Sequence, residues 1–313
     1  MPVSIYSDDA CLRHSAGSAH PERSERIPAI LERLDARRSE FGCAFKTAEP
    51  ASIDSLAAVH DRAYLITLEA TESAPVTVFD ADTAANRSTW RAVCAAAGAA
   101  IAAVDEVIAD SVARPFVVMR PPGHHAEADR AMGFCFVNTA AVAAAHARLV
   151  GIERVAVIDW DVHHGNGTER IFADRSDVLY VSLHQYPHYP GTGAATDRGT
   201  GDGLGFTVNV PLPAGSGEPA YRAAFAERVL PALTDYAPQL LIVSAGFDAD
   251  SRDPLAAMEI GPSAYRWMTE RLIDCAAASA GGRIVHVLEG GYDLSALADG
   301  VESVVATLSG YRV

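Results

Sequence analysis

Two carboxylates and an imidazole alternate along one short stretch of the chain. Asp159, Asp161 and His163 follow directly on the apolar run 155–158 (VAVI). In an extended strand, side chains two positions apart point to the same face, so these three groups would converge at the end of a buried strand. Burial of such groups is costly unless something compensates them. The spacing therefore predicts a divalent-metal site.

A third carboxylate can complete this site. Asp248 follows the apolar run 240–244 (LLIVS), and together with Asp161 and His163 it would supply three metal ligands. Three protein ligands leave a position for water, which is typical of catalytic rather than structural zinc sites. Zinc suits this set, and the oxygen-rich ligands also suit ferrous iron or cobalt. For any one of these residues alone, an internal salt-bridge cluster is the alternative interpretation.

A pair of histidines lies in a loop that its neighbours make stiff. His124 and His125 follow two prolines and a glycine in the sequence RPPGHH. Hydrolysis of an amide by an activated water needs a base and a proton for the leaving amine, and two imidazoles can divide these tasks. Asp159 is a candidate partner for one imidazole and Asn166 for the other. A single loop histidine would more often be inert.

Tyr292 follows Gly290 and Gly291 in the sequence LEGGY. The two glycines allow a sharp turn that would bring the phenol into the site. There the hydroxyl can stabilise a developing oxyanion, and loss of one such donor typically costs roughly 3 to 4 kcal/mol. A core tyrosine after a turn is the alternative interpretation. Serine-hydrolase chemistry is disfavoured because the sequence has no nucleophile elbow of the form G-x-S-x-G.

The candidate residues share one position relative to the predicted elements, because each follows a predicted strand. Short β-rich runs alternate with longer Ala-rich helical runs, which favours one doubly wound, mostly parallel sheet. In such sheets, sites lie beyond the carboxyl ends of the strands, so one site is expected. Strands are predicted at 1–6, 116–119, 155–158, 178–183, 206–210, 240–244 and 284–288, and helices at 88–109, 140–150, 219–233 and 263–280.

Composition excludes several classes of protein. The net charge of −15 over 313 residues argues against nucleic-acid binding, which needs a basic face. An acidic surface can attract cationic substrates, or it can serve solubility alone. No apolar run is expected to reach the ~20 residues of a membrane span, and no signal peptide is recognised. Five dispersed cysteines indicate reduced thiols and a cytoplasmic location.

Four motifs together resemble the zinc-dependent histone deacetylase superfamily. They are RPPGHHA at 120–126, GFCFVN at 133–138, the segment 159–167 and LEGGY at 288–292. The segment 20–26 (HPERSER) resembles the N-terminal signature of the same family. The match runs through nearly the whole chain in the expected order. It fits best the class II branch, which includes bacterial histone-deacetylase-like amidohydrolases and acetylpolyamine amidohydrolases.

The resemblance implies an arginase-deacetylase-like α/β fold. Residues 1–313 would form a single catalytic domain with a central, mostly parallel eight-stranded sheet flanked by helices. Zinc would bind Asp161, His163 and Asp248, in agreement with the spacing argument. His124 and His125 would flank the activated water, with His125 as the general base and acid. Tyr292 would polarise the acyl carbonyl.

Three further sites follow from the same resemblance. An inner monovalent-cation site, usually for potassium, would use the side chains of Asp159 and Ser182 and the carbonyl groups of Asp161, His163 and Leu183. Arg26 matches an arginine that lines an internal acetate-release cavity. The substrate channel would include Gly133, Phe134, Tyr189, Leu255, Gly290, Gly291 and the rim residue Asp82.

Two departures bear on the substrate. Asn166 stands where class I enzymes carry an aspartate, and Leu255 stands where one polyamine-specific branch carries a gatekeeper glutamate. We therefore expect deacylation, mainly deacetylation, of N-acyl-lysine side chains in peptides or proteins. An acetylpolyamine or another small acylated amine is the second candidate substrate, and a catalytically weak acyl-lysine binding protein is the non-enzymatic alternative. Homo-oligomers are common among similar bacterial proteins, and the resemblance leaves that state open here.

Overall fold

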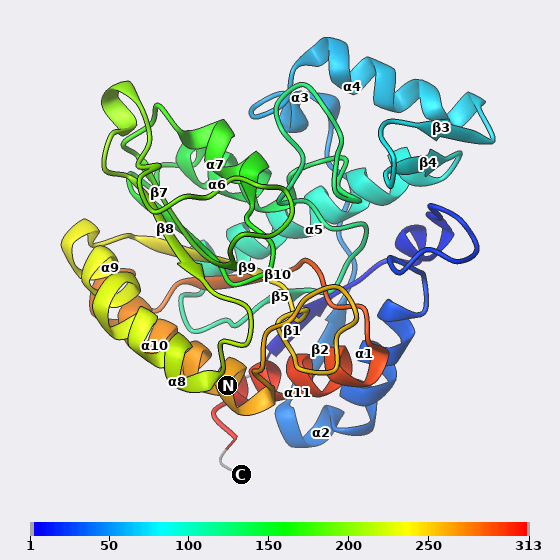
Figure 1. Cartoon of the computed structure of the whole chain (residues 1–313). Helices are drawn as coiled ribbons and strands as arrows, with labels where there is room; N and C mark the ends of the chain where they lie inside the picture. Colours follow the sequence, from blue (N-terminus) through cyan, green and yellow to red (C-terminus); the bar gives the residue numbers. More distant parts are fainter. Residues whose placement is uncertain (1–2, 312–313) are drawn as a thin grey trace.

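Eight parallel strands form one central sheet in the order β2-β1-β5-β10-β9-β6-β7-β8 (Figure 1). The computed structural model describes residues 3–311 of the chain. A separate antiparallel hairpin joins β3 (Val76–Val78) and β4 (Ala84–Asn86). The strands of the large sheet are β1 (Val3–Tyr6), β2 (Cys43–Lys46), β5 (Phe116–Val117), β6 (Val155–Asp159), β7 (Val178–Gln185), β8 (Thr207–Leu212), β9 (Leu240–Ala245) and β10 (Ile284–Leu288).

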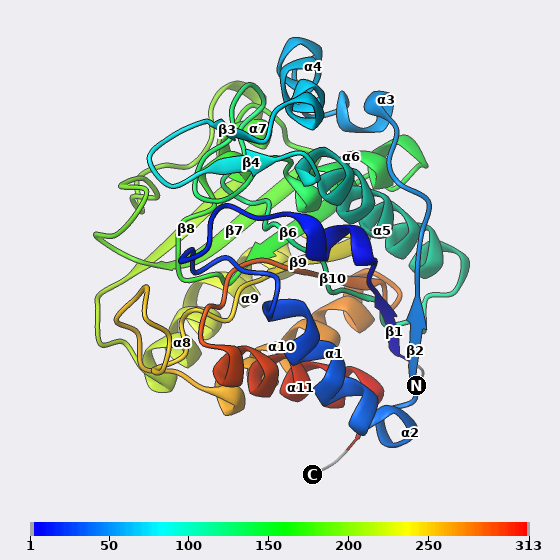
Figure 2. The same ribbon diagram turned by 90° about the vertical axis from the view of Figure 1, so that its right-hand side faces the viewer.

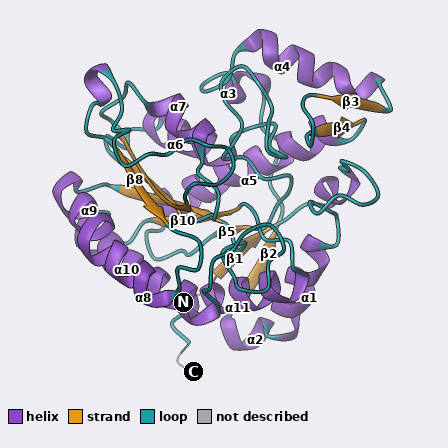
Figure 3. Ribbon diagram, in the orientation of Figure 1, coloured by secondary structure: helices purple, strands orange, loops and turns teal. Residues whose placement is uncertain are grey.

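Helices cover both faces of this sheet (Figures 2 and 3). Helices α5 and α6 pack on one face, and α1, α10 and α11 pack on the other. This arrangement confirms the predicted α/β architecture. The helices are α1 (Arg26–Ala36), α2 (Arg38–Phe41), α3 (Ile53–Leu56), α4 (Arg62–Glu69), α5 (Thr89–Ala109), α6 (Thr139–Leu149), α7 (Asn166–Phe172), α8 (Glu218–Ala224), α9 (Leu230–Tyr236), α10 (Pro262–Ser279) and α11 (Leu294–Ser309).

The sequences of the central strands explain why helices must cover both faces. Every residue of β6 (VAVID) and of β9 (LLIVSA) is buried. Strands of a parallel sheet that are buried on both faces are near-continuous apolar runs rather than alternating ones. The polar groups come where each run ends, at the edge of the sheet that the helices leave open.

Helix α5 corrects the expectation that no segment is long and apolar enough to span a membrane. It has 21 residues, and its most apolar window has a mean hydropathy of 1.8. In this structure 67% of that window is buried, with α5 packed against α6, β5 and β10. Because alanine supplies much of its apolar character, this helix contains no long run of large apolar residues.

The helix predicted at 219–233 is interrupted. A π-helical segment, Phe225–Val229, separates α8 from α9. Pro231 lies in the first turn of α9. Proline has no amide hydrogen, and its ring clashes with the carbonyl group four residues earlier, so a regular α-helix cannot continue through this point.

The strand register brings the predicted site residues to one edge of the sheet. Asp159, at the end of β6, pairs with Ser182 of β7 on one side and Ser244 of β9 on the other. Because the strands are parallel, the loops that follow them begin at the same edge. The loops after β5 and β10 join this edge through the pairing of β10 with β9 and β5.

Candidate active site

The three predicted metal ligands lie together at this edge. Asp161 and His163 come from the loop after β6, and Asp248 comes from the loop after β9. One ligand atom from each lies within 4.8 Å of the others. His163 Nδ1 is 3.1 Å from Asp161 Oδ1 and 3.2 Å from Asp248 Oδ2. All three residues are buried, so two carboxylates share a single imidazole away from solvent.

Backbone amides hold both carboxylates in place. Gly290 N donates to Asp161 Oδ2 at 2.8 Å, and Val162 N donates to Asp248 Oδ1 at 2.9 Å. The other Asp248 oxygen, Oδ2, is buried and accepts no hydrogen bond from the described residues. A buried carboxylate oxygen without a donor is costly unless a cation coordinates it. This atom therefore has the position and the chemistry of a metal ligand.

Two glycines make room for the carboxylates. A Cβ on Gly246 would lie 2.2 Å from Asp161 Oδ2, and a Cβ on Gly290 would lie 2.1 Å from Asp248 Oδ2. Ordinary contacts of a Cβ begin at 3.4 Å, so a side chain at either position would displace a carboxylate. A geometry that requires two glycines around two carboxylates fits a divalent ion.

The pKa shifts within the cluster indicate that it lacks positive charge. Burial and the neighbouring Asp161 raise the pKa of Asp248 to about 7. Burial opposes a charge on His163, but its hydrogen bond with Asp161 and the proximity of the Asp161 and Asp248 carboxylates outweigh this effect and raise its pKa to about 10. Each shift favours additional positive charge in the cluster, which a divalent cation would supply.

The two histidines have different partners. His124 Nδ1 lies 3.0 Å from Asp159 Oδ2, and His125 Nδ1 lies 2.8 Å from Asn166 Oδ1. Despite burial, the charges of Asp161 and Asp159 raise the pKa of His124 well above its usual value. Burial and the neighbouring positive charge of His124 hold the pKa of His125 well below it. One imidazole is thus stabilised as a cation, while the adjacent one is kept neutral and able to accept a proton.

Asp159 does more than contact His124. Its Oδ2 accepts a hydrogen bond from the Tyr180 hydroxyl at 3.0 Å, and its Oδ1 accepts one from Asp161 N at 3.1 Å. Ser182 lies beside it in the sheet register, with its hydroxyl 2.9 Å from His184 Nδ1. Asp159 and Ser182 are thus adjacent, as the cation-site prediction requires. The potassium site itself stays a prediction.

A cavity of about 210 Å³ opens above the cluster. It contains five of the predicted channel residues and adds His188, which the sequence did not single out. Gly290 and Gly291 are not among its lining residues, and Gly290 packs against the two carboxylates, so their place in the channel stays a prediction. The lining residues are Asp82, His125, Gly133, Phe134, His163, His188, Tyr189, Leu255 and Tyr292.

The walls of this cavity pack closely around the histidines. Gly133 has a φ of +57°, and a Cβ there would lie 2.5 Å from the His125 ring. The ring of Tyr189 meets His125 edge-on with centroids 5.2 Å apart, and Phe134 meets Tyr292 in the same way at 5.8 Å. Burial raises the pKa of Tyr292 well above its usual value, so its phenol stays a proton donor.

Arg26 supports Tyr292 from behind. The arginine is fully buried, and its guanidinium lies 5.1 Å from the centre of the Tyr292 ring. It donates to Gly291 O at 2.7 Å and to Glu289 O at 2.5 Å. The side chain thus holds the turn that carries the phenol. Its place in an acetate-release cavity stays a prediction.

Two buried acids that the sequence analysis did not select also shape the site. Glu289 Oε2 accepts from Gly123 N at 2.6 Å and from His124 N at 3.1 Å. Asp253 accepts from Tyr292 N at 2.6 Å through one oxygen and from Leu255 N at 3.0 Å through the other. Glu289 lies inside the LEGGY motif, which was the one available signal. Asp253 is a loop acid with no motif of its own.

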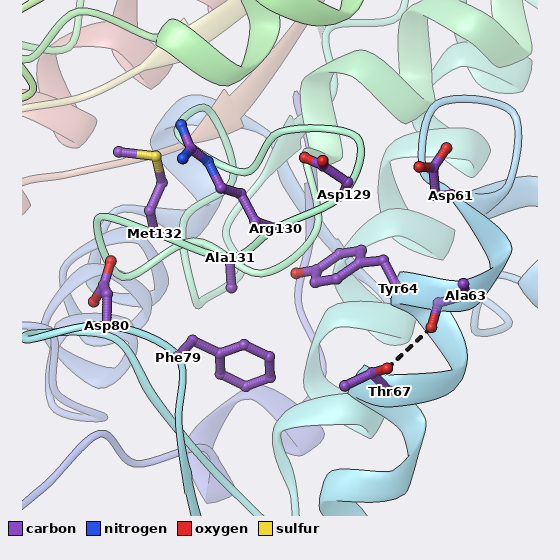
Figure 4. A pocket seen from close by; sticks show the side chains of 10 residues that line it. All are labelled: Asp61, Ala63, Tyr64, Thr67, Phe79, Asp80, Asp129, Arg130, Ala131 and Met132. Carbon is purple, nitrogen blue, oxygen red and sulfur yellow. Dashed lines mark hydrogen bonds between the residues drawn. The ribbon is translucent and has the colours of Figure 1, made fainter.

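A second cavity, of about 590 Å³, is lined by the residues drawn in Figure 4. The segments 79–82 and 129–134 contribute to both cavities. Three carboxylates, those of Asp61, Asp80 and Asp129, line the second cavity around Tyr64 and Phe79. Arg130 also lines this cavity and offsets one of these charges, so its lining is negative on balance.

The constellation of metal-ligand cluster, histidine pair and phenol agrees with a family comparison. The model of the histone deacetylase domain matches residues 20–308. The chain belongs to the histone deacetylase family. This membership confirms the resemblance and makes the chain a hydrolase that acts on amide bonds.

Two relatives and one solved structure illustrate the range of this deacetylase family. A histone deacetylase-like amidohydrolase from Pseudomonas aeruginosa is 40% identical over 99% of this chain and 87% of its own length. The human polyamine deacetylase HDAC10 is 40% identical over 92% of this chain, which corresponds to 44% of the human protein. The crystal structure of the HDA15 HD domain superposes with a TM-score of 0.94 at 37% identity, covering 98% of this chain and 88% of that one.

Proposed function

We propose that this deacetylase removes acyl groups, chiefly acetyl, from the ε-amine of lysine side chains in peptides or proteins. The observation that carries the proposal is one cavity lined by a neutral imidazole, His125, a phenol, Tyr292, and His163 of the buried ligand set. Asp161, His163 and Asp248 would hold Zn²⁺, and Fe²⁺ or Co²⁺ fit the same donors. Residues 1–313 would act as a single catalytic domain in the cytoplasm, in keeping with five free cysteines.

The division of labour follows from the two histidine environments. When bound, the metal would supply Lewis acidity toward water and the acyl carbonyl. His125 would take a proton at Nε2 and pass it to the leaving amine, since its Nδ1 is engaged by Asn166. His124, paired with Asp159, would stay protonated and stabilise negative charge. Tyr292 would donate a hydrogen bond to the carbonyl oxygen.

The inner parts of the site complete the proposal. Asp159, Ser182 and the carbonyl groups of Asp161, His163 and Leu183 would bind K⁺. Arg26 would line the path by which acetate leaves.

The neck of the cavity supports a lysine side chain over a polyamine. Leu255 presents no charge there, and burial lowers the pKa of His188, which favours its neutral form. A neutral neck suits an acylated lysine, because acylation removes the charge of the ε-amine and the side chain then brings no cation into the neck. Acetylpolyamines remain the second candidate, favoured by the negative lining of the second cavity and by the name of the human relative.

A substrate panel tests the proposal. The kcat/KM of the purified, metal-quantified protein should be higher for acetyl-lysine peptides than for acetylputrescine and acetylspermidine, with Asp248→Asn as the inactive control. The reverse order would move the assignment to polyamines. Tight binding of acetyl-lysine peptides without turnover of any substrate would instead support an acyl-lysine binding protein.

The Tyr292→Phe variant tests the role of the phenol. Turnover should fall by about 10²- to 10³-fold. Metal content and stability should not change, because no hydrogen bond among the described residues involves this hydroxyl and the ring keeps its contacts with Phe134 and Arg26. Undiminished turnover would refute the assignment.

A further inference from the structure

Glu127 is a buried acid that has no part in the proposed mechanism. Its side chain lies behind Asn166, away from the cavity, and only 3% of the residue is exposed. Its Oε1 accepts from Asn166 Nδ2 at 3.0 Å and from Arg130 at 2.7 Å, and its Oε2 lies 3.0 Å from Arg170 Nη1. We propose that Glu127 is a positioning residue that orients the Asn166 amide and thereby sets the tautomer of His125.

The two ends of the Asn166 amide differ in chemistry but hardly in shape. The oxygen and the NH₂ group of Asn166 have nearly the same shape, so packing alone cannot decide which end faces His125. An ionised carboxylate can only accept hydrogen bonds. Arg130 Nη2 lies 2.7 Å from Glu127 Oε1, and Arg170 Nη1 lies 3.0 Å from Oε2, so both oxygens face hydrogen-bond donors. The NH₂ end of Asn166 therefore faces Glu127 at 3.0 Å, and its contacts with His125 O at 3.5 Å and Met132 Sδ at 3.4 Å are longer and weaker.

The orientation of the amide then determines the histidine. With its NH₂ group toward Glu127, Asn166 presents Oδ1 to His125 Nδ1 at 2.8 Å. An oxygen acceptor at that distance requires a proton on Nδ1. In the neutral ring the lone pair then lies on Nε2, which is the atom that must accept a proton from the water. A reversed amide would place the lone pair on the wrong nitrogen.

The nature of residue 166 makes this role testable. An aspartate at that position has two equivalent oxygens, so either one can accept from His125 Nδ1 and no orienting partner is required. It would instead place a second carboxylate about 3 Å from Glu127, where like charges repel. The effect of removing the charge of Glu127 should therefore reverse its sign between the two backgrounds. A residue that only supports the fold would give the same sign in both.

The experiment is a double-mutant cycle on kcat, measured with an acetyl-lysine peptide. Glu127→Gln in the wild-type background should lower kcat about tenfold with KM little changed, because glutamine can accept or donate and no longer selects one orientation of the amide. The same change in an Asn166→Asp background should raise kcat. Glu127→Asp, which keeps the acceptor but shortens the side chain, should give an intermediate value. A fall of the same size in both backgrounds would overturn the proposal.

A second readout does not depend on turnover. Nitrogen-15 spectra of histidine-labelled protein report which ring nitrogen carries the proton. The signals of His125 are assigned by their absence from a variant in which this histidine is replaced. Wild type should show Nδ1–H for His125 with and without zinc, and Glu127→Gln should show a mixture. An unchanged tautomer in Glu127→Gln would also overturn the proposal.

The matched control is Arg170→Gln. Its side chain is 67% exposed and contacts Oε2, so the bond from Asn166 to Oε1 should survive and kcat should stay within about twofold of wild type. The inference rests on the proposed function, but the two can fail separately. A wild type without turnover on any peptide would refute the proposed function, and the tautomer measurement would still decide the role of Glu127.

Discussion

Gly290→Ala tests whether the backbone at this turn is shaped around the two ligand carboxylates. The new Cβ would lie 2.1 Å from Asp248 Oδ2 and 2.6 Å from Asp161 Oδ2. The backbone of Gly290 is outside the left-handed region, so alanine meets no conformational obstacle there. Any effect must come from the contact with the carboxylates.

The size of the effect follows from the distances. To reach an ordinary contact of 3.4 Å, Asp248 Oδ2 must move by about 1.3 Å. Val162 N holds the other oxygen of the same carboxylate at 2.9 Å, so the group would have to rotate rather than translate. Metal–ligand distances hold to within about 0.2 Å. We therefore expect zinc affinity to fall by at least about 100-fold, which is about 2.7 kcal/mol.

The assay is competition for zinc with a chelator of known affinity, on protein that was first freed of metal. The metal-free variant should lose only about 1–3 kcal/mol of unfolding free energy, as is usual for one extra buried methyl group. Gly261→Ala is the matched control, because a Cβ there meets nothing closer than 3.9 Å. Zinc affinity within threefold of wild type in Gly290→Ala, with an intact fold, would refute the reasoning.

Two further predictions concern stability and specificity. His60 donates to Glu127 O and accepts from Asn138 N, each at 2.9 Å, and burial lowers its pKa to about 4. The pKa of His60 is lower in the folded state than in the unfolded state, so its contribution to stability is complete above about pH 6.5 and is lost as the pH falls toward 4. Chemical denaturation should show that the difference in unfolding free energy between wild type and His60→Gln shrinks by about 2 kcal/mol from about pH 7.5 to pH 5. Leu255→Glu should raise the kcat/KM of acetylspermidine relative to an acetyl-lysine peptide about fivefold, because a partly exposed ion pair contributes up to about 1 kcal/mol; a ratio that does not rise would exclude the neck as a determinant of charge preference.

The apolar runs and the motifs predict the centre of the molecule well. The runs at 155–158, 240–244 and 284–288 each become a buried strand of the central sheet. Parallel strands that are buried on both faces leave a strong local signal, and the polar residues that end them are equally visible. This is why Asp161, His163 and Asp248 could be grouped before any contact was known.

The periphery and the supporting contacts could not be predicted in this way. Strand β2, with the sequence CAFK, is short and half-buried, so its pattern resembles that of a loop. Glu127 and Asp253 act on residues 39 positions away in each case, through contacts that only the fold creates. A local sequence pattern identifies a group that can do chemistry, but not the distant group that orients it.

The neck at Leu255 has a consequence for how such enzymes diversify. Its loop is held through main-chain atoms: Leu255 N donates to Asp253, Leu255 O accepts from His188 at 3.1 Å, and Ala257 N donates to Gln185 at 2.8 Å. None of these bonds involves the leucine side chain, so a new side chain can appear there while the loop keeps its shape. Selection can then test new substrates at this position by single substitutions, without first acquiring compensating mutations elsewhere in the protein.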